Sequence, residues 1–258
     1  MLKLLFTGRQ LWVTLLVIAG AALCCRLGIW QLERLAQRHA QNALIAARMA
    51  QPAIPLTGAL ANPDALDYRR VEARGVYDPV QEIVLRNRAL DGAPGVHIIT
   101  PLRLSGSDAV VLVDRGWAPL ERASPDERRA FAEPGEVVVQ GIARRSQENA
   151  GGPADPPLGP GQTRRDEWFR VDIPRIAQQA GYKLLPIFIE EQPAPGDQPG
   201  LSDGESDLPR RVATTDLGEG PHLSYTIQWF SFAVILLVGY VAFTYQRLRR
   251  ALDDRVKP

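Results

Sequence analysis

The feature that most constrains this chain is a charge-free run near its C-terminal end, YTIQWFSFAVILLVGYVAFTY, over residues 225–245. A helix over this run is about 30 Å long, which matches the hydrocarbon layer of a membrane. Trp229 lies near one end of the run, and Tyr240 and Tyr245 near the other, where aromatic rings favour the headgroup zones. The alternative is a buried helix in a soluble core, but such helices are rarely apolar on every face over this length. The run therefore predicts a transmembrane helix over residues 225–245.

A second apolar run lies near the N-terminus and reads LWVTLLVIAGAALCC, from Leu11 to Cys25. Arg26 interrupts it, and LGIW extends it to Trp30; an arginine near a helix end can reach the interface. A cleaved signal peptide is the alternative, with residues 19–21 (AGA) as the cleavage site. Because the apolar run continues past that site, and because an uncut anchor pairs sensibly with the second helix, we favour a transmembrane helix over residues 11–30.

Basic residues flank the two runs on their outer sides. Lys3 and Arg9 precede the first run, and the second is followed by Arg247, Arg249, Arg250, Arg255 and Lys257. The positive-inside rule then places both termini, residues 1–10 and a basic tail over residues 246–258, in the cytoplasm. Since the first run begins at Leu11, little room is left for a mitochondrial presequence. We expect a multi-pass protein of a bacterial inner membrane, with residues 31–224 on the periplasmic side.

The residues between the two runs have the composition of a water-exposed domain. Residues 31–224 hold 22 Lys plus Arg and 27 Asp plus Glu, a net charge of 22 − 27 = −5, which argues against a nucleic-acid partner. The two cysteines, Cys24 and Cys25, both lie in the first run. No disulfide framework or CxxC site is therefore predicted, and the pair is interpreted as apolar packing. A lipoprotein signal is disfavoured because Leu23 stands where such a signal needs a small residue.

The middle of the chain predicts a helical stalk followed by a β-rich domain. Helix formers dominate residues 31–52, which end at Pro52. Residues 53–224 then contain short runs of β-formers separated by Gly, Pro, Asp and Ser, namely RRVEARGVY, EIVLRNR, GVHIITPLRL, AVVLVDRGW, EVVVQGIARR and LLPIFIEE. Strands at this spacing suggest an antiparallel sheet or small barrel. One short helix is expected over residues 173–181, with Gly181 as its stop, and loops over residues 151–161 and 193–207. The predicted fold class is an α+β membrane protein, with two transmembrane helices flanking an antiparallel β-rich periplasmic domain.

The sequence offers few residues that could carry chemistry. It contains no nucleophile elbow, Walker loop, dinucleotide fingerprint or zinc pattern, so we expect no enzyme. His39 falls on the stalk and is expected to be exposed, whereas His97 falls in a strand run, where a structural role is expected. His222 lies three residues before the second apolar run, at the predicted periplasmic membrane surface. An imidazole there is either a ligand for a metal or haem iron, or an interfacial polar residue.

GIWQLER contains Gly28, Trp30, Gln31 and Arg34, and VLVDRGWAP contains Asp114. Five other segments between and around the two runs are YRRVEARGVYD, GVHIITPL, WFRVD, PIFIEE and HLSYTIQWF. Together the seven resemble motifs of the surfeit-locus (Shy-type) assembly factors of cytochrome c oxidase. GIWQLER matches that family's Gly-x-Trp-Gln-x-x-Arg, and VLVDRGWAP is similar to its Val-Asn-Arg-Gly-Trp/Phe-x-Pro, with Asp114 where Asn is usual. Each motif alone is weak, but seven in the right order are specific.

The resemblance implies a role in building haem–copper respiratory oxidase, at the stage when haem a enters the largest subunit. It implies His222 as the ligand of the haem iron, with Tyr225 and Trp229 on the same helix face. Arg26 and Arg34 are candidates for holding the haem propionates. The implied partners are the membrane, oxidase subunit I and haem a synthase. Two alternatives stay open: a scaffold that stabilises an oxidase assembly intermediate without haem, and an unrelated two-span periplasmic sensor or envelope protein.

Overall fold

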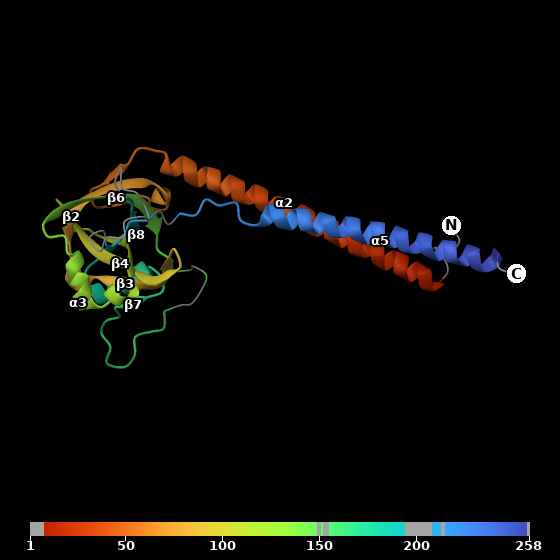
Figure 1. Ribbon diagram of the computed structural model, residues 1–258. Coiled ribbons are helices and arrows are strands. Elements are labelled where there is room, and N and C mark those ends of the chain that lie inside the picture. The colour runs from red at the N-terminus through yellow and green to blue at the C-terminus, as the bar shows by residue number, and fades with distance from the viewer. Residues whose placement is uncertain (1–7, 149–150, 152–154, 194–207, 213–214, 257–258) are drawn as a thin grey trace. The chain divides into compact units, whose positions relative to one another are not determined.

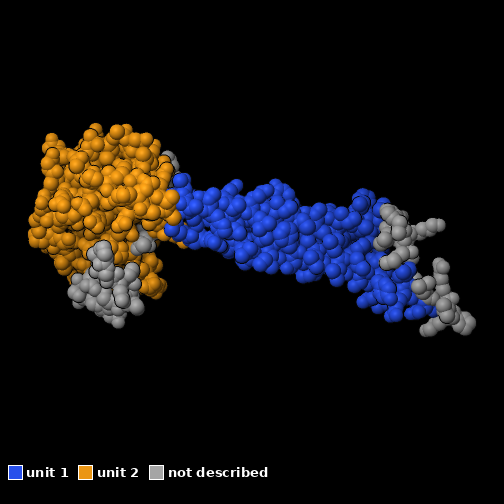
Figure 2. Space-filling view, turned by 90° about the horizontal axis from the view of Figure 1, so that it is seen from above, with its two compact units in different colours: residues 1–44, 217–258 blue, residues 45–216 orange. Residues whose placement is uncertain are grey.

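The structure, a computed structural model, describes residues 8–148, 151, 155–193, 208–212 and 215–256. The chain forms two compact units, one of residues 1–44 with residues 217–258, and one of residues 45–216 (Figure 2). The first unit is helical, and the second contains every described strand.

The helical unit is built from α2, Gly8–Met49, and α5, His222–Val256. α2 runs without a break over the predicted first span and most of the predicted stalk, and its last residues, 45–49, belong to the second unit. The two helices lie side by side and antiparallel (Figure 1), because Gln10 accepts a hydrogen bond from Arg247 and Gln31 contacts His222. Both helices are long and apolar enough to cross a membrane, by length and composition.

Small residues on α2 allow the two helices to approach closely. Ala21 and Cys24 are buried against Ala233 of α5, and a Cβ atom on Gly28 would lie 2.9 Å from the ring of Phe230. Small residues at this spacing let two helix backbones approach closely. Both cysteines are free thiols and pack in this seam, so their interpretation as apolar packing is confirmed.

The described residues of the second unit form eight strands and several short helices. The strands are β1 (Ile54–Leu56), β2 (Arg70–Tyr77), β3 (Ile83–Leu90), β4 (Ala93–Leu104), β5 (Val110–Pro119), β6 (Glu136–Arg145), β7 (Glu167–Trp168) and β8 (Leu184–Glu191). The α-helices are α3 (Pro125–Arg128) and α4 (Ile173–Ala180), and 3-10 turns cover Pro63–Leu66, Pro79–Gln81, Leu120–Arg122 and Arg129–Phe131. Each of the six strand runs expected from the sequence coincides with one of the longer strands.

Five of the strands close into a barrel. The sheet order is β1-β2-β6-β8-β5-β4-β3-β7, and an additional β2–β4 pairing joins the ends of the β2-β6-β8-β5-β4 segment. The prediction of an antiparallel sheet is wrong for three pairs, because β1–β2, β3–β7 and β5–β8 are parallel. The partners β5 and β8 are separated by β6, β7 and α4 along the chain, and local strand patterns carry no information about such remote pairing.

The barrel interior is filled by the alternate residues of its strands. β2 alternates between exposed or half-exposed and buried residues along its length, and its Val71 and Ala73 pack with Leu102, Val113 and Ile189. A second cluster packs beneath α4 and includes Ile173, Ile176, Trp168 and Phe188. Both clusters belong to one β-rich unit, as the sequence predicts.

The predicted short helix is confirmed as α4. Asp172 caps its start by accepting a hydrogen bond from the backbone N–H of Arg175 at 3.2 Å, and Gly181 ends it with φ 74°. The described part of the predicted loop over residues 151–161 contains no helix or strand. The predicted loop over residues 193–207 lies outside the described residues except for Pro193.

Two Arg-Gly pairs depend on the missing Cβ of their glycines. A Cβ on Gly75 would lie 2.1 Å from the carbonyl oxygen of Arg103 on the adjacent β4. Gly116 has φ 116°, and a Cβ there would lie 2.1 Å from the carbonyl oxygen of Arg210. Arg210 exchanges two backbone hydrogen bonds with Trp117, at 2.7 and 2.8 Å. Glycine is required at both positions by close backbone approach.

Candidate functional site

His222 is the first residue of α5, and its side chain contacts Gln31 of α2. The distance from His222 Nδ1 to Gln31 Oε1 is 2.9 Å. Because an amide oxygen only accepts hydrogen bonds, the Nδ1–H of His222 is the donor, and in the neutral form of the ring Nε2 then carries the lone pair. His222 is half-buried, whereas Gln31 is buried. The contact therefore fixes one tautomer of the imidazole and leaves the other ring nitrogen able to bind a metal.

The helix seam explains why these two side chains meet. Gly28 lies three residues before Gln31, so the two share a side of α2, and Gly28 admits the ring of Phe230. On α5, Thr226 donates its hydroxyl to the carbonyl oxygen of His222 at 2.9 Å and is buried. Two residues of the GIWQLER motif thus have separate roles. Gly28 allows α2 and α5 to approach closely, and Gln31 is the hydrogen-bond partner of the His222 imidazole.

The two aromatic residues predicted beside His222 lie in different surroundings. Tyr225 has 46% of its surface exposed. Trp229 packs into the seam with the cluster of Ala21, Cys24 and Ala233. Trp229 therefore packs against α2, the helix that covers the predicted first span. Haem binding by His222, Tyr225 and Trp229 stays a prediction.

The two arginines proposed for haem propionates differ in their position on α2. Arg34 lies three residues after Gln31, about one turn along the same side, and donates to Gln37 at 3.1 Å. Arg26 lies five residues before Gln31, about 140° around the helix at roughly 100° per residue. Both side chains are exposed. Arg34 is therefore the better placed of the two to reach a ligand held between Gln31 and His222.

The other two histidines have partners of their own. His39 is exposed, as expected, and lies 3.0 Å from Glu219. His97 is buried, and its Nδ1 lies 2.9 Å from Asp114 Oδ2. Asp114 Oδ1 also accepts a hydrogen bond from the backbone N–H of Gly116 at 3.0 Å. The carboxylate therefore contacts both the backbone of β5 and the His97 imidazole. Within the described residues there is no group of three or more His, Cys, Asp or Glu side chains that could hold a metal ion.

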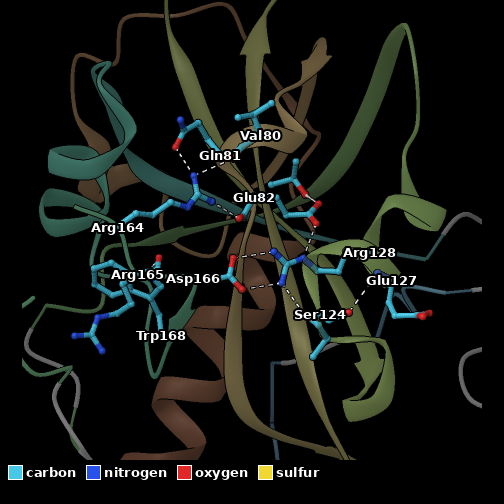
Figure 3. A network of polar contacts seen from close by, with 12 residues as sticks. Val80, Gln81, Glu82, Ser124, Glu127, Arg128, Arg164, Arg165, Asp166 and Trp168 are labelled. Carbon is cyan, nitrogen blue, oxygen red and sulfur yellow. Dashed lines mark hydrogen bonds and ion pairs between the residues drawn. The ribbon is translucent and has the colours of Figure 1, made fainter. Parts of the chain in front are cut away.

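The β-rich unit contains a buried ionic network that the sequence did not predict (Figure 3). At its centre, Arg128 Nε donates to Glu82 Oε1 at 3.0 Å, and its two terminal nitrogens donate to Asp166 at 2.8 and 2.9 Å. Thr100 donates to the other oxygen of Glu82 at 2.6 Å. Burial lowers the pKa of Arg128, but hydrogen bonds and attraction from Asp166 and Glu82 outweigh it, so the pKa is raised overall.

A second group of charges surrounds Arg115, a fully buried side chain. Its Nη2 lies 2.7 Å from Glu133 Oε1, and its guanidinium lies 4.8 Å from the ring centre of Tyr77. Arg211 approaches Glu191 at 2.8 Å, yet burial raises the pKa of Glu191 above its ordinary value. Arg115 is the arginine of the VLVDRGWAP motif. Only the placement of charged residues inside runs of β-formers, as in VVLVDRGW, could have indicated burial.

Comparison with known proteins places the chain in a family. The family model described as SURF1 family matches residues 18–234, which is most of the 258 residues. The chain belongs to the SURF1 family. It is 28% identical to the mouse (Mus musculus) surfeit locus protein 1 over 236 residues, covering 85% of this chain and 70% of the mouse protein.

Other members of the family match over a similar extent. An uncharacterized SURF1-like protein of Mycobacterium tuberculosis is 29% identical over 259 residues, covering 96% of this chain and 88% of its own length. A SURF1-like protein of Monosiga brevicollis is 27% identical over 228 residues, covering 83% and 81%. The family predicted from the seven motifs is confirmed. Membership implies a role in cytochrome c oxidase assembly and sets aside an unrelated sensor or envelope protein.

Proposed function

We propose that this chain is a membrane-anchored, non-enzymatic assembly factor that binds haem a through His222 and hands it to the largest subunit of cytochrome c oxidase. The observation that carries the proposal is the 2.9 Å contact between His222 Nδ1 and Gln31 Oε1. A histidine that binds iron ordinarily donates its other ring N–H to an acceptor, which fixes the ring and its tautomer. Gln31 supplies that acceptor, and Nε2 of His222 keeps its lone pair for the iron.

The surroundings of His222 suit a largely apolar cargo. Leu223 and Tyr225 follow it on α5 with about half of their surfaces exposed, and the helix beyond them is apolar enough to cross a membrane. Haem a bears a farnesyl tail, which such a surface keeps from water. When bound, haem a would be oriented by its carboxylates, for which Arg34 is the better placed cation. A single axial ligand suits a chaperone that must release its cargo.

The proposed setting is a bacterial inner membrane, with both helices spanning it. The apolar side chains on the outer surfaces of α2 and α5 are widely exposed, as in Trp12 at 74% and Leu16 at 76%. Basic residues flank the two apolar runs on the side of both termini, which supports cytoplasmic termini and a periplasmic β-rich unit. Reporter fusions test this topology. Alkaline phosphatase is expected to be active when inserted after Gly106 and inactive after Pro258, and the reverse pattern contradicts it.

The first test of the haem proposal is an optical spectrum of the full chain. The chain is purified in detergent from cells that make haem a, beside the His222→Ala variant and a matched His39→Ala control on the same helical unit. A haem a spectrum is expected in the wild type and in the control, and is expected to be lost or shifted in His222→Ala. Haem bound equally by all three proteins would move the ligand to another residue.

A further outcome distinguishes the carrier from the scaffold. If none of the proteins holds haem, while oxidase maturation still requires the chain, haem delivery is refuted and a scaffold for an assembly intermediate is left. Subunit I, as recipient, and haem a synthase, as donor, are the proposed partners. Co-purification of each with the wild type but not with His222→Ala would tie partner binding to the loaded state.

A further inference from the structure

A cavity of about 590 Å³ opens beside the buried network of Glu82 and Arg128 in the β-rich unit. Its volume falls within the range of about 300–1,000 Å³ that is typical of small-molecule sites. Every lining residue belongs to the part of the chain that the structure describes. The lining consists of Pro79, Val80, Glu82, Pro125, Arg128, Arg129, Ala132, Arg164 and Asp166.

Most charged side chains of this lining have partners of opposite charge. Arg128 Nε lies 3.0 Å from Glu82 Oε1, and Arg128 Nη2 lies 2.8 Å from Asp166 Oδ1. Arg129 Nη1 lies 3.0 Å from Oδ1 of Asp126, which is not part of the lining. These contacts account for both carboxylates of the lining and for two of its three arginines.

Arg164 is the third arginine, and its hydrogen bonds end on uncharged acceptors (Figure 3). Its Nη1 donates to the backbone oxygen of Val80 at 2.8 Å and to Gln81 Oε1 at 2.7 Å. Its Nη2 donates to the backbone oxygen of Glu82 at 2.6 Å. Since a guanidinium has five N–H donors, Nε–H and one hydrogen of Nη2 have no acceptor among the described residues. Arg164 therefore brings to the cavity a positive charge that no described carboxylate neutralises, and two donors.

The uncharged part of the lining is apolar and exposed. Pro79 and Val80 lie in the 3-10 turn before β3, Pro125 is the first residue of α3, and Ala132 follows the 3-10 turn after α3. All four are exposed, and Val80 has 77% of its surface exposed. Because the rings of the two prolines fix their φ angles, this wall is largely formed before a ligand arrives, which lowers the entropic cost of binding. An apolar wall with one converging charged group is typical of a site for a small molecule.

We propose that this cavity binds a small monocarboxylate with an apolar body. The carboxylate accepts hydrogen bonds from the two remaining donors of Arg164, a planar group whose geometry matches a carboxylate. The apolar body lies against Val80 and the two prolines, where it leaves water. One cation suits one negative charge, whereas the carboxylates of Glu82 and Asp166 in the same lining repel a dianion such as a phosphate ester. The proposal concerns the β-rich unit alone and does not depend on haem binding by His222.

The test uses the full chain in detergent and three probes at one pH and one ionic strength. 4-Phenylbutanoate has both the carboxylate and the apolar body, 4-phenylbutanamide lacks the charge, and acetate lacks the apolar body. Calorimetry and the thermal unfolding midpoint are read for each probe, and titrations into detergent alone are subtracted. 4-Phenylbutanoate is expected to raise the midpoint and to bind about tenfold or more tightly than either of the other probes, because a charge-assisted contact is worth at least that factor.

Two variants test whether the probe occupies this cavity. Arg164→Gln removes the cation and is expected to raise the dissociation constant of 4-phenylbutanoate about tenfold. Val80→Glu is expected to weaken binding as well, because it adds a carboxylate that competes for Arg164 while keeping the backbone oxygen to which Arg164 donates. Arg74→Gln is the matched control and is expected to bind like the wild type, because Arg74 is exposed, paired with Glu72 and not part of the lining.

Three results refute the proposal. They are the absence of 4-phenylbutanoate binding, equal binding of 4-phenylbutanoate and 4-phenylbutanamide, and binding that Arg164→Gln and Val80→Glu weaken no more than Arg74→Gln does. If Arg164→Gln does not fold, Val80→Glu decides the question, because the side chain that it replaces is exposed.

Discussion

Replacing Arg128 by methionine should destabilise the β-rich unit more than any surface substitution. Arg128 and Glu82 have only 5% and 6% of their side chains exposed, and the substitution leaves the Glu82 carboxylate buried without its closest cation. Breaking a buried ion pair from one side costs about 3–5 kcal/mol. Arg115 remains 3.5 Å from Glu82, and Thr100 still donates to it. These remaining contacts place the expected loss of unfolding free energy near the lower bound, at about 3 kcal/mol.

The assay is urea unfolding of the full chain in detergent, followed by the fluorescence of the tryptophans, among which the buried Trp168 follows Asp166 closely in the sequence. Arg129→Met is the neighbouring control and should change stability by less than about 0.5 kcal/mol, because its ion pair is exposed. Adding Glu82→Gln to Arg128→Met should recover at least about 1 kcal/mol by removing the orphaned charge. Equal stabilities for the two single variants, or further loss in the double variant, would refute the reasoning.

Three further predictions concern other positions. Gly116→Ala should cost about 2–4 kcal/mol and lower the midpoint of urea unfolding, because its Cβ would meet the Arg210 carbonyl 2.1 Å away at a positive φ; a midpoint equal to the wild type would contradict this. Gln31→Leu should keep the helical circular dichroism but weaken haem binding about 10–100-fold by freeing the His222 ring, whereas Gln31→Glu should retain binding. Burial raises the pKa of Glu191, so the folded state binds its proton more tightly, and this residue's contribution to stability falls as pH rises above the ordinary value of 4.5. Glu191→Gln should therefore reduce the fall in the free energy of unfolding as pH rises above 4.5, measured from urea unfolding curves at several pH values. An unchanged slope of unfolding free energy against pH would show that Glu191 does not cause the fall.

Much of the fold follows from local patterns in the chain. Charge-free runs predicted both long helices, and alternation in segments such as RRVEARGVY predicted the strands. Gly181 was predicted as a helix stop, because a left-handed residue ends helices, and it has φ 74°. The parallel pairing of β5 with β8 could not be predicted. A strand's alternation records which of its faces is buried, but not the direction or identity of its neighbour.

Of the two side chains in contact at the candidate site, the sequence predicted only His222, and it did so from the position of that residue before an apolar run. His222 stands at the head of an apolar run, which drew attention to it, but Gln31 lies 191 residues away in sequence. The residues next to His222 and Gln31 do not indicate that the two side chains are in contact. The one related signal is that Gly28, where the helices approach closely, lies on the same side of α2 as Gln31. The network of Glu82 and Arg128 was missed for a related reason. In a chain with 30 Lys plus Arg, each arginine looks solvated until its burial is known.

The position of β8 as one of the five strands of the barrel has a consequence for how the protein is synthesised and folds. β8 lies between β5 and β6, so the ring stays open until Glu191 has left the ribosome. Until then β5 and β6 each present an unpaired edge, the kind of surface that promotes aggregation. Closure joins segments far apart along the chain, which slows folding. The nascent protein thus spends the greater part of its synthesis with an incomplete barrel, during which a general chaperone would have these two edges to protect.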